Sequence, residues 1–218
     1  MNDDKRASES GATQSPHAVP QACAAVLLAA GSASRFTGPT HKLLAPLQGR
    51  TVIEWSFRAV MEAGFATVIV INGPIPFELE GSGVVNVHNP LWVSGQASSV
   101  RAGIAAAQAL QMTSVVVGLA DQPFVTAEAW RNVALSSMPI AVASYVVSEP
   151  DSLTGVIKTT RTRGNPVRLA DSVWDLLPEE GDFGARNLIS SRPELVEEVL
   201  CSGSPSDIDT IEDLRKWN

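Results

Sequence analysis

Apolar runs alternate with amphipathic stretches along most of the chain. Five of these runs predict β-strands: Ala24–Ala30, Thr67–Asn72, Val84–His88, Ser114–Ala120 and Ile140–Val147. The runs are continuous rather than alternating, which is typical of strands in a sheet covered on both faces. Because helical patterns separate them, the sequence predicts an α/β fold with a mostly parallel sheet.

Three helices are expected between these strands. The first is predicted to end at Gly64, a favourable C-cap residue, and to bury a face made of Val52, Ser56, Ala59, Val60 and Ala63. Ser98 or Ser99 is expected to cap the second, with inward positions at Val100, Ile104, Ala107 and Leu110. Thr126 is expected to cap the third, which continues through Trp130 and Val133. Beyond Val147 the pattern loosens, which indicates a lobe with a few short elements.

The 218-residue length fits one domain. Residues 1–22 are rich in charged residues, serine and proline and are expected to form a disordered tail, with a single domain over 23–218. The first apolar run is far shorter than the about 20 residues of a membrane span. No targeting segment is recognised in residues 1–22.

The net charge limits the classes of binding partner that the sequence predicts, and the cysteine content indicates the cellular compartment. The net charge of −7 argues against a broad nucleic-acid surface or an anionic membrane as partner. Cys23 and Cys201 are far apart and have no metal-ligand spacing, so neither a disulfide nor a zinc site is expected. This cysteine usage fits a reducing cytoplasm, the predicted location.

The loop Gly31–Lys42 follows the first predicted strand and carries two cations, Arg35 and Lys42. Small residues let the backbone approach a ligand closely, and the candidate nucleotide contacts are Leu28, Ala29, Ala30 and Gly31. Together with the two cations, they are suited to a polyphosphate. The loop lacks both the P-loop Gly-Lys-Ser/Thr and GxGxxG. A simple turn with solvated cations is the alternative.

Two acidic positions are candidates for binding a divalent cation. Asp121 follows an apolar strand, although it also suits a turn or a cap for the helix near Thr126. Asp207 and Asp209 face one way in an extended segment, and one of them is a candidate second ligand. Here the alternative is that the acids only favour the dipole of a C-terminal helix, which Thr210 and Asp213 are expected to cap.

The segment Asn89–Ser99 supplies further candidates. Gly95, Gln96 and the serine pair that ends at Ser99 lie before a predicted helix N-terminus, where free amides and hydroxyls suit a base or a sugar. Trp92 is expected to be core or wall rather than a stacking platform.

Six motifs then occur in an order that resembles the molybdenum cofactor cytidylyltransferases of the MobA-like NTP transferase family. They are LAAGSASRF with HKLL, NPLWVSGQASSVRAG, GLADQPFV, RGNPVRL, GDFGARNL and DIDTIEDL. The resemblance extends from about Ala24 to Trp217. It implies a three-layer α/β/α, Rossmann-like fold of the glycosyltransferase-A type.

The resemblance also implies a function: Mg²⁺-dependent transfer of CMP from CTP to the phosphate of molybdopterin, with release of pyrophosphate and a molybdoenzyme as the receiver of the product. It implies that Arg35 and Lys42 neutralise the triphosphate, that Gly95 lies near the base, and that Asp121 and Asp209 hold the metal. Asn165, Asp182 and Arg186 are the implied acceptor positions, although Asp182 also suits the N-cap of a following helix.

Departures from the family pattern keep alternatives open. Arg35-Phe36-Thr37-Gly38 replaces the usual Arg-Met-Gly, whereas Ala29-Ala30-Gly31 favours CTP over GTP. A different NTP with a sugar phosphate as acceptor is the main alternative. A nucleotide-dependent oxidoreductase is disfavoured by the missing GxGxxG, and a non-catalytic cofactor carrier by the presence of Asp121 and Asp209.

Overall fold

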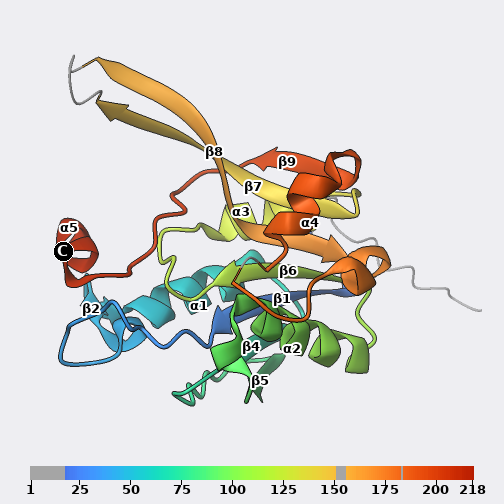
Figure 1. Cartoon of the computed structure of the whole chain (residues 1–218), viewed down its shortest axis with the longest axis horizontal. Coiled ribbons are helices and arrows are strands. Elements are labelled where there is room, and N and C mark those ends of the chain that lie inside the picture. Colours follow the sequence, from blue (N-terminus) through green and yellow to red (C-terminus); the bar gives the residue numbers. More distant parts are fainter. Residues whose placement is uncertain (1–17, 151–155, 183) are drawn as a thin grey trace, which may run out of the picture.

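The computed structural model describes residues 18–150, 156–182 and 184–218 (Figure 1). The strands are β1 Cys23–Ala29, β2 Pro46–Leu47, β3 Arg50–Thr51, β4 Val68–Asn72, β5 Val84–His88, β6 Ser114–Leu119, β7 Ile140–Pro150, β8 Ile157–Ala170 and β9 Val196–Leu200. The α-helices are α1 Val52–Ala63, α2 Gln96–Ala109, α3 Ala127–Ala134, α4 Arg186–Ser191 and α5 Ile211–Trp217. Short 3₁₀ helices include η1 Lys42–Leu44, η2 Trp92–Ser94 and η3 Asp171–Leu176.

Seven strands form the main sheet in the order β5-β4-β1-β6-β8-β7-β9. Six run in one direction and β8 runs against them, which confirms the mostly parallel sheet. The chain moves outward from β1 to β4 and β5, then returns to place β6 on the other side of β1. Ligands of open α/β sheets bind at such a reversal, beyond the carboxyl ends of the strands.

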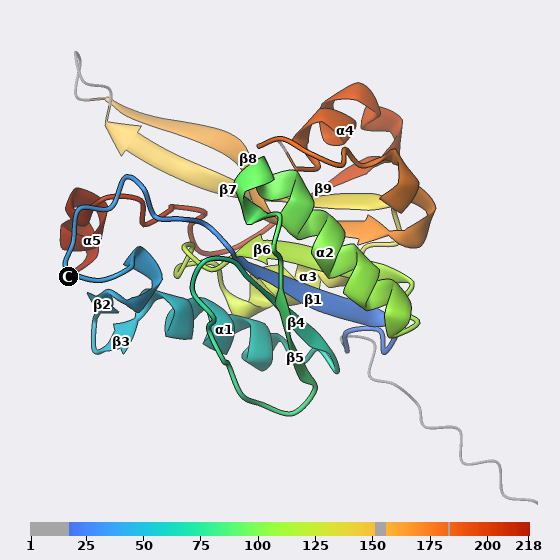
Figure 2. The same cartoon turned by 60° about the horizontal axis from the view of Figure 1, so that its bottom comes forward.

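Helices cover both faces of this sheet (Figure 2). One apolar cluster joins the sheet to α1 and α3, and a second joins its other face to α2 and α4. Strand β1 is buried along its whole length because it is covered on both sides. The expected three layers are therefore present.

Local signals place two helices as predicted. Thr51 and Glu54 form a capping box at the start of α1, and Gly64 ends it in the left-handed conformation (φ 88°). The Thr126 side chain caps α3 by accepting a hydrogen bond from the Ala129 amide, and Trp130 is buried.

The start of α2 differs from the prediction. Its N-cap is Gly95, so Ser98 and Ser99 lie inside the helix and are buried rather than capping it. The Ala97 amide donates to the carbonyl of Gly181, a contact from a distant segment that no local signal reveals. Leu110, expected to face inward, ends the helix and is exposed.

The region after Val147 is more ordered than expected. Strands β7 and β8 form a long antiparallel hairpin, part of which projects from the body (Figure 1). Residues 157–163 of β8 are exposed on both faces. They carry mainly Thr, Lys and Arg, so this half of the strand has no apolar run from which to predict it.

The packed part of the chain begins before the predicted boundary at Cys23, because Val19 is buried in the core. The rest of the predicted tail, residues 1–17, lies outside the described residues. Within the described part of the chain, no helix is both long and apolar enough to cross a membrane.

Candidate active site

A cavity of about 490 Å³ opens at the carboxyl ends of the parallel strands. The loop after β1, the loop after β6 and the segment 203–210 all reach it, and four aspartates line it: Asp121, Asp182, Asp207 and Asp209. We call it the carboxylate cavity. It lies where the strand order reverses between β1 and β6, the position expected for a ligand site.

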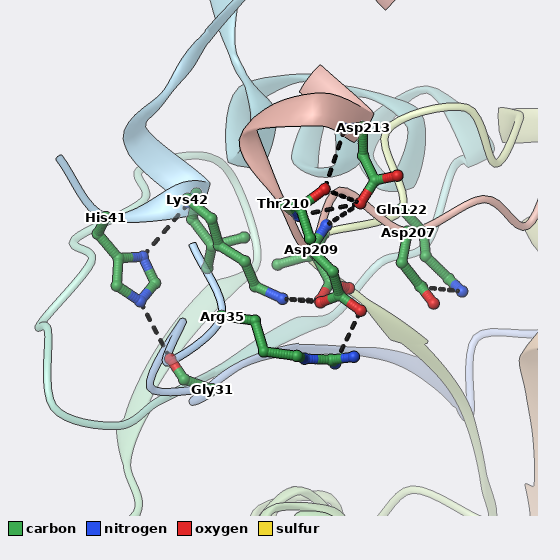
Figure 3. Close-up of polar contacts among 12 residues, drawn as sticks. Gly31, Arg35, His41, Lys42, Gln122, Asp207, Asp209, Thr210 and Asp213 are labelled. Atoms are coloured by element: carbon green, nitrogen blue, oxygen red, sulfur yellow. Dashed lines mark hydrogen bonds and ion pairs between the residues drawn. The ribbon is translucent and has the colours of Figure 1, made fainter. Parts of the chain in front are cut away.

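Lys42 joins two of these aspartates. Its Nζ lies 2.5 Å from Asp121 Oδ2. The same Nζ lies 2.7 Å from Asp209 Oδ1 (Figure 3). Burial alone would lower the pKa of Lys42, but the ion pairs with Asp121 and Asp209 outweigh it and raise that pKa above its usual value. Lys42 is therefore a fixed cation, and residues far apart in sequence converge on it.

Arg35 reaches one of these two carboxylates, Asp209, from the loop after β1. Its Nη2 donates to Asp209 Oδ2 at 2.8 Å, while 74% of its side chain is exposed. Asp209 thus contacts both predicted cations. An exposed guanidinium can exchange one anionic partner for another, because a surface ion pair contributes at most about 1 kcal/mol.

The aspartates fit a hard divalent cation. Asp121 Oδ1 is buried and accepts no hydrogen bond from any residue that the structure describes. Across residues 18–150, 156–182 and 184–218, no group of three or more His, Cys, Asp or Glu side chains is arranged to hold a metal. Mg²⁺ needs no such group, because it commonly combines one or two carboxylates with substrate phosphates.

His41 fastens the loop after β1. Its Nδ1 accepts a hydrogen bond from the Leu43 amide, so its Nε2–H donates to the Gly31 carbonyl at 3.1 Å. Both contacts require the neutral ring, and burial, the largest influence, lowers the pKa of His41. His41 therefore tethers Gly31 beside Lys42.

Most of the predicted nucleotide contacts line the carboxylate cavity. They are Leu28, Ala30, Gly31, Arg35, Lys42, Gly95 and Ser99. Ala29 does not line it, because successive residues of a strand face opposite sides of the sheet. The side chain of Ala29 is buried in the apolar cluster that packs against α1 and α3. Trp92 forms part of the wall, as expected.

Asp182, an implied acceptor position, lines the carboxylate cavity. It belongs to a turn packed on Gly95, where an added Cβ would lie 2.6 Å from the Gly181 backbone and 2.7 Å from Asp182 Oδ1. It is not the N-cap of α4, which is Ala185.

A second cavity of about 530 Å³ adjoins the first, and we call it the β8 cavity. Its floor is apolar and buried, formed by Val100, Val117, Val142, Val167, Leu169 and Ile189. Asn165, one predicted acceptor position, lines it; Arg186, another, lines both cavities together with Asp207. The two cavities therefore form one continuous site, in which one half is lined by aspartates and cations and the other half combines an apolar floor with polar and charged residues.

Gln122 is a site residue to which the sequence assigned no role, and it contacts Asp207, one of the two candidates that the sequence offered for the second metal ligand. Gln122 Nε2 donates to Asp207 Oδ1 at 2.7 Å. Burial and the nearby charge of Asp121 raise the pKa of Asp207 to about 6. Gln122 stands next to Asp121 in sequence, but its partners follow much later, so only the fold connects them.

Comparisons with known proteins agree on the family. Residues 25–197 match the family model of the MobA-like NTP transferase domain. The chain is 31% identical over 144 residues to the 2-C-methyl-D-erythritol 4-phosphate cytidylyltransferase of Prochlorococcus marinus, covering 64% of this chain and 62% of that protein. It is 29% identical over 135 residues to the bifunctional enzyme IspD/IspF of Ruegeria sp., covering 58% of this chain and 34% of that enzyme. The matched part is thus less than two thirds of either relative.

Solved structures show the same fold. Rv0371c from Mycobacterium tuberculosis superposes with a TM-score of 0.69 at 27% identity, covering 89% of this chain and 96% of that one. The same protein has also been solved in complex with manganese. A nucleotidyl transferase from Methanothermobacter, at 24% identity, superposes with a TM-score of 0.70 over 89% of this chain and 95% of its own.

Proposed function

Because the chain belongs to the MobA-like NTP transferase family, we propose that it transfers a nucleoside monophosphate from an NTP to a phosphorylated acceptor and releases pyrophosphate. The observation that carries this proposal is the pair of cations, Arg35 and Lys42, held on carboxylates in a cavity that continues into a second, apolar one. A triphosphate suits the charged half, and the body of an acceptor suits the apolar half.

The proposed chemistry needs no protein nucleophile. An oxygen of the acceptor phosphate attacks the α-phosphorus in line, the bond from that phosphorus to the bridging oxygen breaks, and pyrophosphate leaves with the bonding electrons. The protein contributes alignment of two anions and neutralisation of their charge. Lys42 and Arg35 exchange their aspartate partners for phosphate oxygens and stabilise the departing pyrophosphate.

Asp121 and Asp209 are the residues that would hold Mg²⁺, and the unpartnered Asp121 Oδ1 supports this assignment. Bound there, the ion would supply positive charge to the α-phosphate. The manganese complex of Rv0371c is consistent with a divalent cation in this fold.

CTP is the proposed donor. Two similar proteins are named for cytidylyl transfer or for an IspD function, and Ala29-Ala30-Gly31 follows the cytidylyl rather than the guanylyl pattern. The backbone at Ala30 and Gly31, with Gly95 and Ser99 opposite, is proposed to contact the nucleotide.

Molybdopterin is the proposed acceptor, and a molybdoenzyme would then receive the product. The β8 cavity supports it, because a buried apolar floor with polar groups at the rim suits a flat heterocycle. Asn165, Asp182 and Arg186 are the proposed acceptor contacts. The second candidate is a sugar phosphate, which the name of the Prochlorococcus relative favours.

A thermal-shift panel tests the donor. CTP, GTP, UTP and ATP are each added with and without Mg²⁺, and NAD(P) serves as the oxidoreductase control. A ligand at about 100 times its dissociation constant adds about 2.7 kcal/mol, which is several degrees for a domain of this size. A Mg²⁺-dependent shift led by CTP supports the proposal. A larger shift with another NTP would mean that this nucleotide, and not CTP, is the donor. No shift with any NTP would contradict the proposal.

A further inference from the structure

Gln122 lies where three segments of the site meet. Its side chain is buried, and it contacts the segment that leads to Asp209 on one side and strand β8 on the other. Nε2 donates to the Pro205 carbonyl at 2.9 Å and to Asp207 Oδ1 at 2.7 Å. Oε1 accepts a hydrogen bond from Asn165 Nδ2 at 3.2 Å.

These partners fix the orientation of both amides. The Pro205 carbonyl can only accept a hydrogen bond, so the NH₂ group of Gln122 must face it. Gln122 Oε1 therefore faces Asn165, and the NH₂ group of Asn165 must face Gln122. The backbone of Asn165 is held as well, because the buried Tyr145 donates its hydroxyl to the Asn165 carbonyl at 2.5 Å.

One N–H and the carbonyl oxygen of the Asn165 amide are left over. No residue that the structure describes binds either of them, and Asn165 lines the β8 cavity above its apolar floor. The amide thus offers one fixed donor and one fixed acceptor, which are complementary to a ligand that carries both an acceptor and a donor, as a lactam or a primary amide does. Sugar hydroxyls are both donors and acceptors and need no such fixed pair.

We propose that Gln122 is a positioning residue for the acceptor: it orients the Asn165 amide so that the β8 cavity recognises a lactam edge, such as that of a pterin. The inference rests on the proposed function for the identity of the acceptor. Gln122 itself touches neither reacting group in this account and acts through Asn165.

A double-mutant cycle tests the coupling. Gln122→Met, Asn165→Ala and the double variant are assayed for pyrophosphate release with CTP and molybdopterin. Each single change is expected to raise the acceptor KM by about three- to tenfold, the effect of one hydrogen bond, with CTP affinity unchanged. The acceptor KM of the double variant is expected to rise only as much as that of the more strongly affected single variant, because both changes remove the same contact with the acceptor. Additive effects, or an equal loss of CTP affinity, would overturn the inference. Gln108→Met, at an exposed position of α2, is the matched control.

A second readout needs no acceptor. The side-chain amide resonances of Asn165 are followed by ¹⁵N NMR in the ligand-free protein, and Gln122→Met is expected to shift them and to speed their exchange with water. Unchanged Asn165 signals would overturn the inference whatever the acceptor. Shifted signals in an enzyme that does not use molybdopterin would instead refute the proposed acceptor and leave the positioning contact in place. If Gln122→Met does not fold, Gln122→Asn, whose shorter side chain cannot span the same contacts, takes its place.

Discussion

Lys42 Nζ lies 2.5 Å from Asp121 Oδ2, an ion pair between residues that are 79 positions apart in the chain. The same ammonium contacts Asp209. In the ligand-free protein, the cation proposed for the triphosphate thus neutralises the carboxylates proposed for the metal. Binding of nucleotide and binding of metal should therefore support each other, because phosphate oxygens draw Lys42 away from the aspartates.

Replacing Lys42 separates these two roles. We expect Lys42→Met to bind Mn²⁺ at least about fivefold more tightly without nucleotide, because two competing ion pairs are lost and both are more buried than an exposed pair of about 1 kcal/mol. The same variant should bind CTP more weakly. Electron paramagnetic resonance of free Mn²⁺ measures the first quantity, and titration calorimetry measures the second. Lys158→Met, on the exposed part of β8, is the control, and Mn²⁺ binding that weakens in Lys42→Met would contradict the competition.

Removing one negative charge at Asp121 should abolish turnover and leave the fold intact. The asparagine keeps the size of the side chain but loses the charge that attracts a divalent cation. We expect no detectable pyrophosphate release from Asp121→Asn at saturating Mg²⁺, with a melting temperature close to that of the unmodified protein. Asp175→Asn, at an exposed position in η3, is the matched control. Normal turnover by Asp121→Asn would refute the metal assignment.

Arg35→Ala should weaken nucleotide binding by about 1.5–3 kcal/mol, the usual contribution of a hydrogen bond to a charged group. Stability should change little, because the ion pair that Arg35 forms with Asp209 in the free protein is largely exposed. Calorimetric titration with CTP and Mg²⁺ measures the affinity. Arg58→Ala removes another exposed ion pair, with Glu62, away from the site, and an Arg35→Ala affinity no different from that control would count against the role.

Acid should loosen the loop that His41 fastens. The pKa of His41 is lower in the folded protein than in the unfolded chain, so the unfolded state binds more protons near pH 6 and stability falls as the pH drops through about 6.5. The effect should stay below about 1 kcal/mol, because the ring is only half-buried.

His41→Ala should lack this part of the pH dependence. Urea unfolding at pH 7.5 and 5.5 measures it, and His88→Ala, at an exposed position of β5, controls for the loss of an imidazole. An identical pH dependence in His41→Ala and the unmodified protein would show that the tether does not depend on the neutral ring.

Local chemistry allowed much of the fold to be predicted. The end of α1 at Gly64 and the cap of α3 at Thr126 are determined within a few residues, and the sequence placed both correctly. The start of α2 depends instead on the contact between Ala97 and Gly181, which exists only after folding. The exposed half of β8 is stabilised by pairing with β7 rather than by burial, so its composition resembles that of a loop.

The site residues also fall into two groups: local sequence signals predict some of them, and the others depend on contacts between distant segments. Arg35, Lys42 and Asp121 stand in the segments that follow predicted strands, and the rule that ligands bind at carboxyl ends of strands brings them together. The sequence did not predict that the turn of Asp182 packs on Gly95, because that contact joins segments far apart in the chain. Gln122 was overlooked for the same reason: its contacts with Asn165 and Asp207 join three separate segments.

The most direct test of the proposed function measures the transfer of label from [α-³²P]CTP to molybdopterin in the presence of Mg²⁺. Parallel reactions replace the donor by GTP or the acceptor by 2-C-methyl-D-erythritol 4-phosphate. The account predicts a labelled molybdopterin product, formed in equal amount to pyrophosphate and absent with Asp121→Asn. Label transferred only to the sugar phosphate, or no transfer from any NTP, would contradict it.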